Sequence, residues 1–220
     1  MGEQVKNLQQ LKSTLAIMGG YVEDALMQST QALLERNPNN HENVQKIEDK
    51  INESHVLVDQ ICLNLLAKLS PFASDLRLIL ACYKMNTDLE RMGDHARNIS
   101  RGTSKYLARK EIPHEKDFLQ LITETRSMVK QALDSFMNKD IERAREVLLR
   151  DDVVDDLKHS LTDKMKDLMK KDPDSVDSAL DFILFARNLE RIADLATNIA
   201  EDVIFISSGD DVRHGGLTKQ

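Results

Sequence analysis

The sequence LERMGD at residues 89–94 recurs as LERIAD at residues 189–194, an offset of 100 residues. At the same offset an alanine, an asparagine and an isoleucine also recur: Ala96, Asn98 and Ile99 return as Ala196, Asn198 and Ile199. Around both copies, apolar residues are spaced alternately by three and four, the period of a helix that buries one face. The repeat therefore predicts two related units, each containing an equivalent helix.

The same apolar period predicts three helices in each unit. The expected helices run from Leu8 to the turn at Asn37, from about Glu42 to Leu69, from Pro71 to about Leu107, from Phe118 to Ala132, from about Ile141 to Lys171, and from Asp172-Pro173 to Ile206. We expect an all-α protein of two tandem, pseudo-symmetric three-helix bundles. Residues 1–110 would form the first, residues 111–208 the second, and residues 209–220 a flexible tail.

Composition narrows the class of protein. The chain has 220 residues and a formal net charge of −7, and it lacks a Lys/Arg stripe interleaved with aromatic residues, so we expect no nucleic-acid binding. Cys62 and Cys82 form no Cys-x-x-Cys pair, which excludes a disulfide framework. No stretch approaches the roughly 18 apolar residues of a membrane span. We therefore expect a cytoplasmic protein that reaches a membrane through partners only.

Acidic pairs four residues apart mark both copies of the repeat. Glu90 and Asp94 project from one face of a helix, and Glu190 and Asp194 recur in the same frame. With 37 acidic residues in the chain, about six such pairs arise by chance, so one pair alone means little. The recurrence of the acidic pair at the same position of both repeats is much less likely to arise by chance.

A partner set on the preceding helix accompanies each acidic pair. Glu48 and Asn52 precede the first, and Asp151 and Asp155 precede the second. Oxygen ligands of this kind suit hard cations. The competing interpretation is ordinary solvated surface, because these acids fall opposite the apolar seam of their helices. Both interpretations stay open from spacing alone.

Enzyme chemistry finds little support in the sequence. A di-iron bundle needs paired Glu-x-x-His motifs, and the one match, Glu111 to His114, contains Pro113. Gly-rich phosphate loops, nucleophile elbows and Cys-His pairs are missing from the sequence. We expect a protein that is not an enzyme, with a metal-dependent hydrolase as the weakest alternative.

Two longer blocks resemble a known family. The stretches PFASDLRL at residues 71–78 and DLERMGD at residues 88–94 resemble the first repeat of the PhoU family of phosphate-uptake regulators. ARNLERIAD at residues 186–194 and NIAE at residues 198–201 are similar to its second repeat. The resemblance covers essentially the whole chain and implies two three-helix bundles side by side.

The resemblance also implies metal clusters on the bundle surface. Their ligands would be Glu48, Asn52, Glu90 and Asp94 in the first half, and Asp151, Asp155, Glu190 and Asp194 in the second. Asn52 stands where the pattern has an acid, so the first site carries less charge. The ion would be Fe³⁺, Mn²⁺, Mg²⁺ or Zn²⁺, since oxygen ligands tolerate several hard ions.

The implied role is regulation of phosphate uptake. A family member represses the phosphate-starvation response by linking the ATPase of the phosphate ABC transporter to a membrane sensor histidine kinase, and we expect a homodimer. The alternative is a metal-free helical scaffold that only docks partners.

Overall fold

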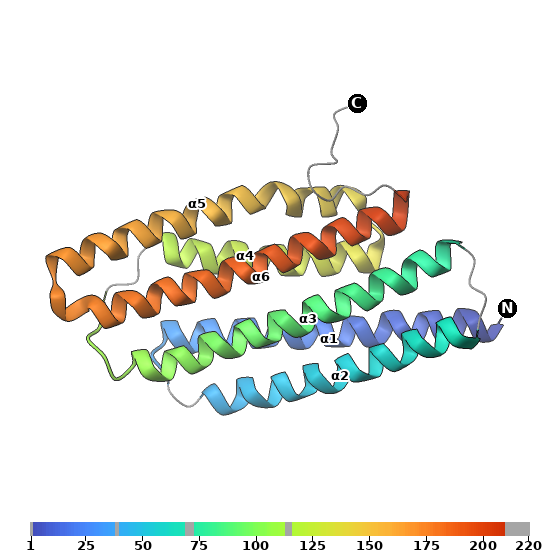
Figure 1. Ribbon diagram of the computed structural model, residues 1–220, viewed down its shortest axis with the longest axis horizontal. Helices are drawn as coiled ribbons and strands as arrows, with labels where there is room; N and C mark the ends of the chain where they lie inside the picture. Colours follow the sequence, from blue (N-terminus) through green and yellow to red (C-terminus); the bar gives the residue numbers. More distant parts are fainter. Residues whose placement is uncertain (1, 38–39, 69–72, 113–115, 210–220) are drawn as a thin grey trace.

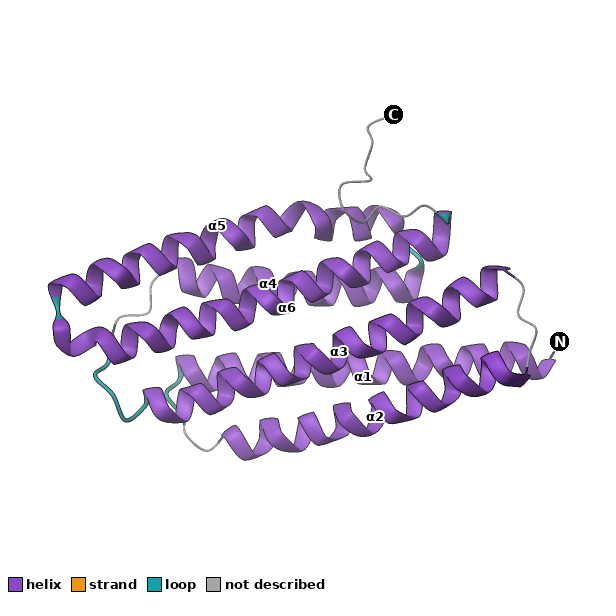
Figure 2. Cartoon of the chain, viewed as in Figure 1, coloured by secondary structure: helices purple, strands orange, loops and turns teal. Residues whose placement is uncertain are grey.

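A computed structural model describes residues 2–37, 40–68, 73–112 and 116–209. Within these ranges the chain forms α-helices and no strand (Figure 2), as the apolar period predicts. The helices are α1 (Gly2–Leu34), α2 (His41–Lys68), α3 (Ala73–Tyr106), α4 (Lys116–Asn138), α5 (Ile141–Lys171) and α6 (Val176–Ser208). The all-α prediction is confirmed.

The helices form two bundles of three that lie side by side (Figure 1). In the first bundle α1, α2 and α3 pack against one another, and in the second α4, α5 and α6 do the same. The bundles meet mainly where α3 lies along α6, with a smaller contact between α1 and α4. The tandem pseudo-symmetric arrangement expected from the repeat is thereby confirmed.

The helices α3 and α6 run antiparallel at the junction. His95 Nδ1 lies 2.9 Å from Asn188 Oδ1, whereas Lys84 Nζ lies 3.5 Å from Asp202 Oδ1. Residue numbers therefore decrease along α3 in the direction in which they increase along α6. Because the two helices are also equivalent in sequence, a pseudo-twofold axis relates the two ends of this junction.

The apolar stripes are buried, and they form one continuous core rather than two separate ones. Leu89 and Leu189 are 0% and 1% exposed, in line with their place on the helix seam. Tyr106 of α3 joins the halves, because its ring centroid lies 5.3 Å from that of Phe182 on α6, and Phe182 in turn packs on Phe118 of its own bundle with the centroids 4.9 Å apart. Such pairs add about 0.5–1.5 kcal/mol each beyond area burial.

The start of the sixth helix differs from the expectation. Asp172 ends α5, and a short 3₁₀ helix, η2 (Pro173–Ser175), precedes α6. The Asp172 side chain makes no capping hydrogen bond, because it pairs with Lys110 Nζ at 2.5 Å instead.

Several expectations fall on residues that the structure does not describe. The Pro71 start of the third helix and residues 210–220 of the expected tail lie outside the described ranges, while Gly209 closes α6 with φ of 82°. The division of the chain between residues 110 and 111 stays a prediction.

Candidate functional site

The first acidic set lies between α2 and α3, around an arginine that sequence reasoning missed. Glu48 is 4% exposed and accepts hydrogen bonds from Asn52 Nδ2 at 2.7 Å and Gln45 Nε2 at 2.6 Å. Arg97 donates to Glu48 Oε1 at 3.0 Å and to Asp94 Oδ1 at 2.7 Å. One guanidinium therefore bridges the two helices and neutralises both carboxylates.

The structure brings three of the four predicted residues of this set together, namely Glu48, Asn52 and Asp94. Glu90 lies half-buried one turn before Asp94 and is not part of this hydrogen-bonded group. Arg97 lies three residues after Asp94, a spacing that allows an ion pair on one helix face. Its counterpart in the second half is Thr197, so this cation belongs to the first set alone.

The second acidic set lies between α5 and α6 and keeps four carboxylates. Lys158 Nζ is 3.5 Å from Glu190 Oε1, and Arg191 lies 3.1 Å from Asp194 Oδ2. Both contacts are longer than those of Arg97, and the Arg191 side chain is 52% exposed against 34% for Arg97. Solvent therefore screens the Arg191 pair more than the Arg97 bridge.

Two carboxylates of the second set have raised pKa values because they are partly buried and lie near other carboxylates. Burial, together with the nearby carboxylates of Asp194 and Asp155, raises the pKa of Asp151 to about 6. Burial and the neighbouring Glu190 also raise the pKa of Asp194. Like charges held close together disfavour joint ionisation. The four carboxylates thus lie close to one another.

One oxygen in the second set lacks a hydrogen-bond partner. Glu190 Oε2 is buried and accepts no hydrogen bond, and its nearest cation, Arg191 Nε, is 3.7 Å away. A buried carboxylate oxygen left without a donor costs about 1–3 kcal/mol or more. A cation in this position would remove that cost.

The two sets differ in how well they fit a metal ion. Among the described residues, no group of three or more His, Cys, Asp or Glu side chains stands ready to hold a metal. The second set offers four carboxylates, and one oxygen of Glu190 among them is unsatisfied, so its chemistry fits a hard cation. The first set does not fit as it stands, because Arg97 already occupies the space between Glu48 and Asp94.

Comparison with known proteins places the chain in a family. The model of the PhoU domain matches residues 15–103 and again residues 118–203. The chain belongs to the PhoU family. Its two matches correspond to the two bundles, so both halves are PhoU domains.

Curated relatives of this PhoU-family chain cover nearly its whole length. A phosphate-specific transport system accessory protein PhoU homolog from Pseudomonas aeruginosa is 36% identical over 96% of this chain and 88% of the relative. A homolog from Aquifex aeolicus is 34% identical over 95% of each. The corresponding protein of Escherichia coli is 29% identical over 98% of this chain.

Solved PhoU structures share the fold. The crystal structure of PhoU from Pseudomonas aeruginosa superposes with a TM-score of 0.91 at 33% identity, covering 93% of this chain and 99% of that one. The phosphate transport system regulatory protein PhoU from Streptococcus pneumoniae gives 0.87 at 26% identity, covering 95% and 99%. Among the described residues of this PhoU-family chain, no helix is long and apolar enough to cross a membrane.

Proposed function

We propose that this PhoU-family protein is an accessory regulator of a phosphate-specific transport system. In this role it links the ATPase of the phosphate ABC transporter to a sensor histidine kinase, and it represses the phosphate-starvation response when phosphate is plentiful. The observation that carries the proposal is the match of both PhoU domains, together with relatives of that name over 96% of the chain.

The architecture supports an adaptor. The two bundles share a fold, but their equivalent surfaces carry different side chains, as the replacement of Arg97 by Thr197 shows. A protein of this kind presents two chemically distinct surfaces on one rigid core. Each surface is then available to a different partner, which is the physical requirement for linking a transporter to a kinase.

We propose further that the second acidic set is a metal site. Asp151 and Asp155 from α5 and Glu190 and Asp194 from α6 would hold a hard cation, which supplies positive charge and clamps the two helices together. Lys158 and Arg191, which now face the two acids on α6, would turn away toward solvent.

A metal-free scaffold is the second candidate function, and one observation favours it. Arg97, Lys158 and Arg191 neutralise acids of both sets without any ion. Metal analysis of protein purified without a His-tag separates the two candidates. Less than stoichiometric Fe, Mn, Mg and Zn in protein from unsupplemented cells would favour the scaffold, and sedimentation of the same sample tests the expected homodimer.

Deletion of the gene tests the regulatory role. The deletion strain should express phosphate-starvation genes in plentiful phosphate, and the wild-type gene supplied in trans should restore repression. A strain that lacks this chain and every other PhoU-family chain, yet represses normally, would refute the proposal.

A further inference from the structure

Five large apolar side chains form an exposed patch near one end of the first bundle. We call the group Leu63, Leu66, Leu76, Leu80 and Tyr83 the apolar patch. Leu63 is 63% exposed, Leu80 43% and Tyr83 46%. Exposed apolar groups that gather in one place commonly mark interaction sites, whereas single exposed leucines need no explanation.

Helix register brings the patch residues together. Cys62 Sγ lies 3.9 Å from the carbonyl oxygen of Ile79, which aligns the end of α2 with the start of α3. The patch residues on α2 follow Cys62 by one and four positions, and those on α3 flank Ile79. On α3 they are spaced i, i+4 and i+7, so they follow one helix face.

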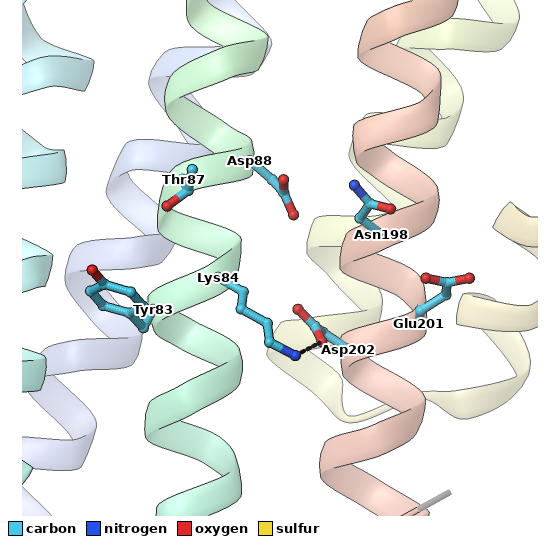
Figure 3. A pocket seen from close by; sticks show the side chains of 7 residues that line it. All are labelled: Tyr83, Lys84, Thr87, Asp88, Asn198, Glu201 and Asp202. Atoms are coloured by element: carbon cyan, nitrogen blue, oxygen red, sulfur yellow. Dashed lines mark ion pairs between the residues drawn. The ribbon is translucent and has the colours of Figure 1, made fainter. Parts of the chain in front are cut away.

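An acidic cavity adjoins the patch across α3. It has a volume of about 320 Å³, and Tyr83 belongs both to its lining and to the patch. Figure 3 shows Asp88 pointing from α3 toward α6, with Tyr83 on the other side of α3. One cation, Lys84, faces three carboxylates in this cavity: those of Asp88, Glu201 and Asp202.

Neighbouring groups on α3 and α6 hold the acidic side chains of the cavity in place. Asp202 is 5% exposed, and Lys84 Nζ lies 3.5 Å from its Oδ1 atom (Figure 3). Asn198 of α6 lies across from Asp88 in the same cavity (Figure 3). The acids are thus fixed by α3 and α6 rather than carried on free surface side chains.

The pseudo-twofold axis supplies an internal comparison. On α6 a second exposed apolar stripe, Val176, Leu180 and Leu184, borders a second cavity of about 460 Å³. That cavity has the opposite balance, with three cations against two carboxylates: Arg101, Lys105 and Arg109 against Asp177 and Asp181. At the offset of 100 residues, the three acids of the first cavity are replaced: Asp88 by Asn188, Glu201 by Arg101, and Asp202 by Gly102. The acidic character therefore belongs to one end of the junction and is not a property of the fold.

We infer that the apolar patch and the acidic cavity together dock an amphipathic helix of a partner protein, one whose apolar stripe is bordered by lysine or arginine. The stripe would cover the patch, and a basic side chain would enter the cavity beside Asp88 and Asp202. A second copy that placed its own patch on this one would bring two acidic cavities together, which charge repulsion opposes. The inference rests on the proposed adaptor role, for which it names one docking surface.

A labelled peptide provides the test with purified full-length protein. The probe is an amphipathic helix with leucines at i, i+4 and i+7 flanked by lysines, and the matched peptide carries glutamates in place of the lysines. Fluorescence anisotropy at physiological salt should show binding of the lysine peptide only. Leu80→Ser and Asp88→Asn should each weaken it by about tenfold. The equivalent Leu180→Ser should leave binding within about twofold, and circular dichroism should show every variant folded.

Four outcomes overturn the inference. Equal binding of both peptides would show that charge complementarity does not select the partner. Equal losses of peptide affinity in Leu80→Ser and Leu180→Ser would show that the peptide does not bind at the apolar patch. Conversion of a dimer to a monomer by Leu80→Ser alone would show that a second copy covers the patch. A deletion strain complemented with each variant separates this inference from the proposed function. If Leu80→Ser represses as well as wild type while the deletion derepresses, the regulatory role stands and this surface fails.

Discussion

Gly102 of α3 lies directly against the ring of Phe185 of α6. A Cβ atom at position 102 would lie 2.6 Å from Phe185 Cε1. This distance is shorter than the contacts that Cβ atoms make in real proteins. The ring has little room to retreat, because it packs on Tyr106 and Phe182 with centroid distances of 6.2 and 6.0 Å. This contact sets how closely the two bundles approach.

Gly102→Ala should therefore destabilise the protein by about 1–3 kcal/mol, the usual cost of overpacking a core. Urea denaturation followed by circular dichroism measures the change. Gly20→Ala is the matched control, since a Cβ at Gly20 of α1 meets nothing within 4 Å. The control should stabilise the helix by up to about 1 kcal/mol, because alanine favours helix over glycine. Equal effects of the two changes would show that the Phe185 contact does not limit the approach of α3 and α6.

Metal should stabilise the protein through the second acidic set. We expect a higher melting temperature in Mn²⁺, Mg²⁺, Zn²⁺ or Fe³⁺, since a bound cation offsets both the burial and the carboxylate repulsion that raise the pKa of Asp151. Glu190→Ala or Asp194→Ala should remove more of this gain than Glu90→Ala. Differential scanning fluorimetry with and without each ion reports the gain. An unchanged melting temperature with all four ions would leave the acids as solvated surface.

Arg97 should behave as the resident cation of the first acidic set. Arg97→Met keeps much of the side-chain length but leaves Glu48, 4% exposed, without its guanidinium. We expect a loss of about 1–3 kcal/mol in metal-free buffer, the cost of an unpaired buried acceptor or more. Added Mg²⁺ or Mn²⁺ should restore part of it. Arg101→Met, which removes an exposed arginine one turn along α3, should change stability by less than about 0.5 kcal/mol. A loss that no ion reduces would show that this set does not accept a metal in place of Arg97.

Glu23 should make stability depend on pH. It lies in the groove between α1 and α4, where burial raises the pKa of its carboxyl above the ordinary 4.5. A raised pKa means that folding disfavours the charged form, so this stability is complete below about pH 4.5 and falls as pH rises through the folded value. Glu23→Gln should therefore stabilise the protein at pH 7 relative to wild type, and the difference should vanish near pH 4.

Urea midpoints measured at several pH values between 4 and 8 check this pH dependence. Asp24→Asn provides the control, because Asp24 is the exposed neighbour at the edge of the same groove. A gain at pH 7 that persists unchanged at pH 4 would assign the effect to packing rather than to ionisation.

The sequence by itself determined the class of fold, the repeat and the acidic pairs within single helices. Leu89 and Leu189 are buried because a helical period of three and four places every such residue on one face, whatever the helix packs against. The acidic pairs follow the same local rule. The spacing places Glu190 and Asp194 on one face of α6, whereas their approach to Asp151 depends on how α5 packs on α6.

Only the tertiary structure decided which charges meet and how the halves join. Arg97 bridges Glu48 and Asp94 because α2 and α3 run antiparallel in one particular register, and a long flexible side chain reaches whatever that register supplies. The contact of His95 with Asn188 likewise depends on the register of α3 against α6. That register is set by close packing of distant residues, such as Gly102 on Phe185, and helical periodicity within one segment contains no information about it.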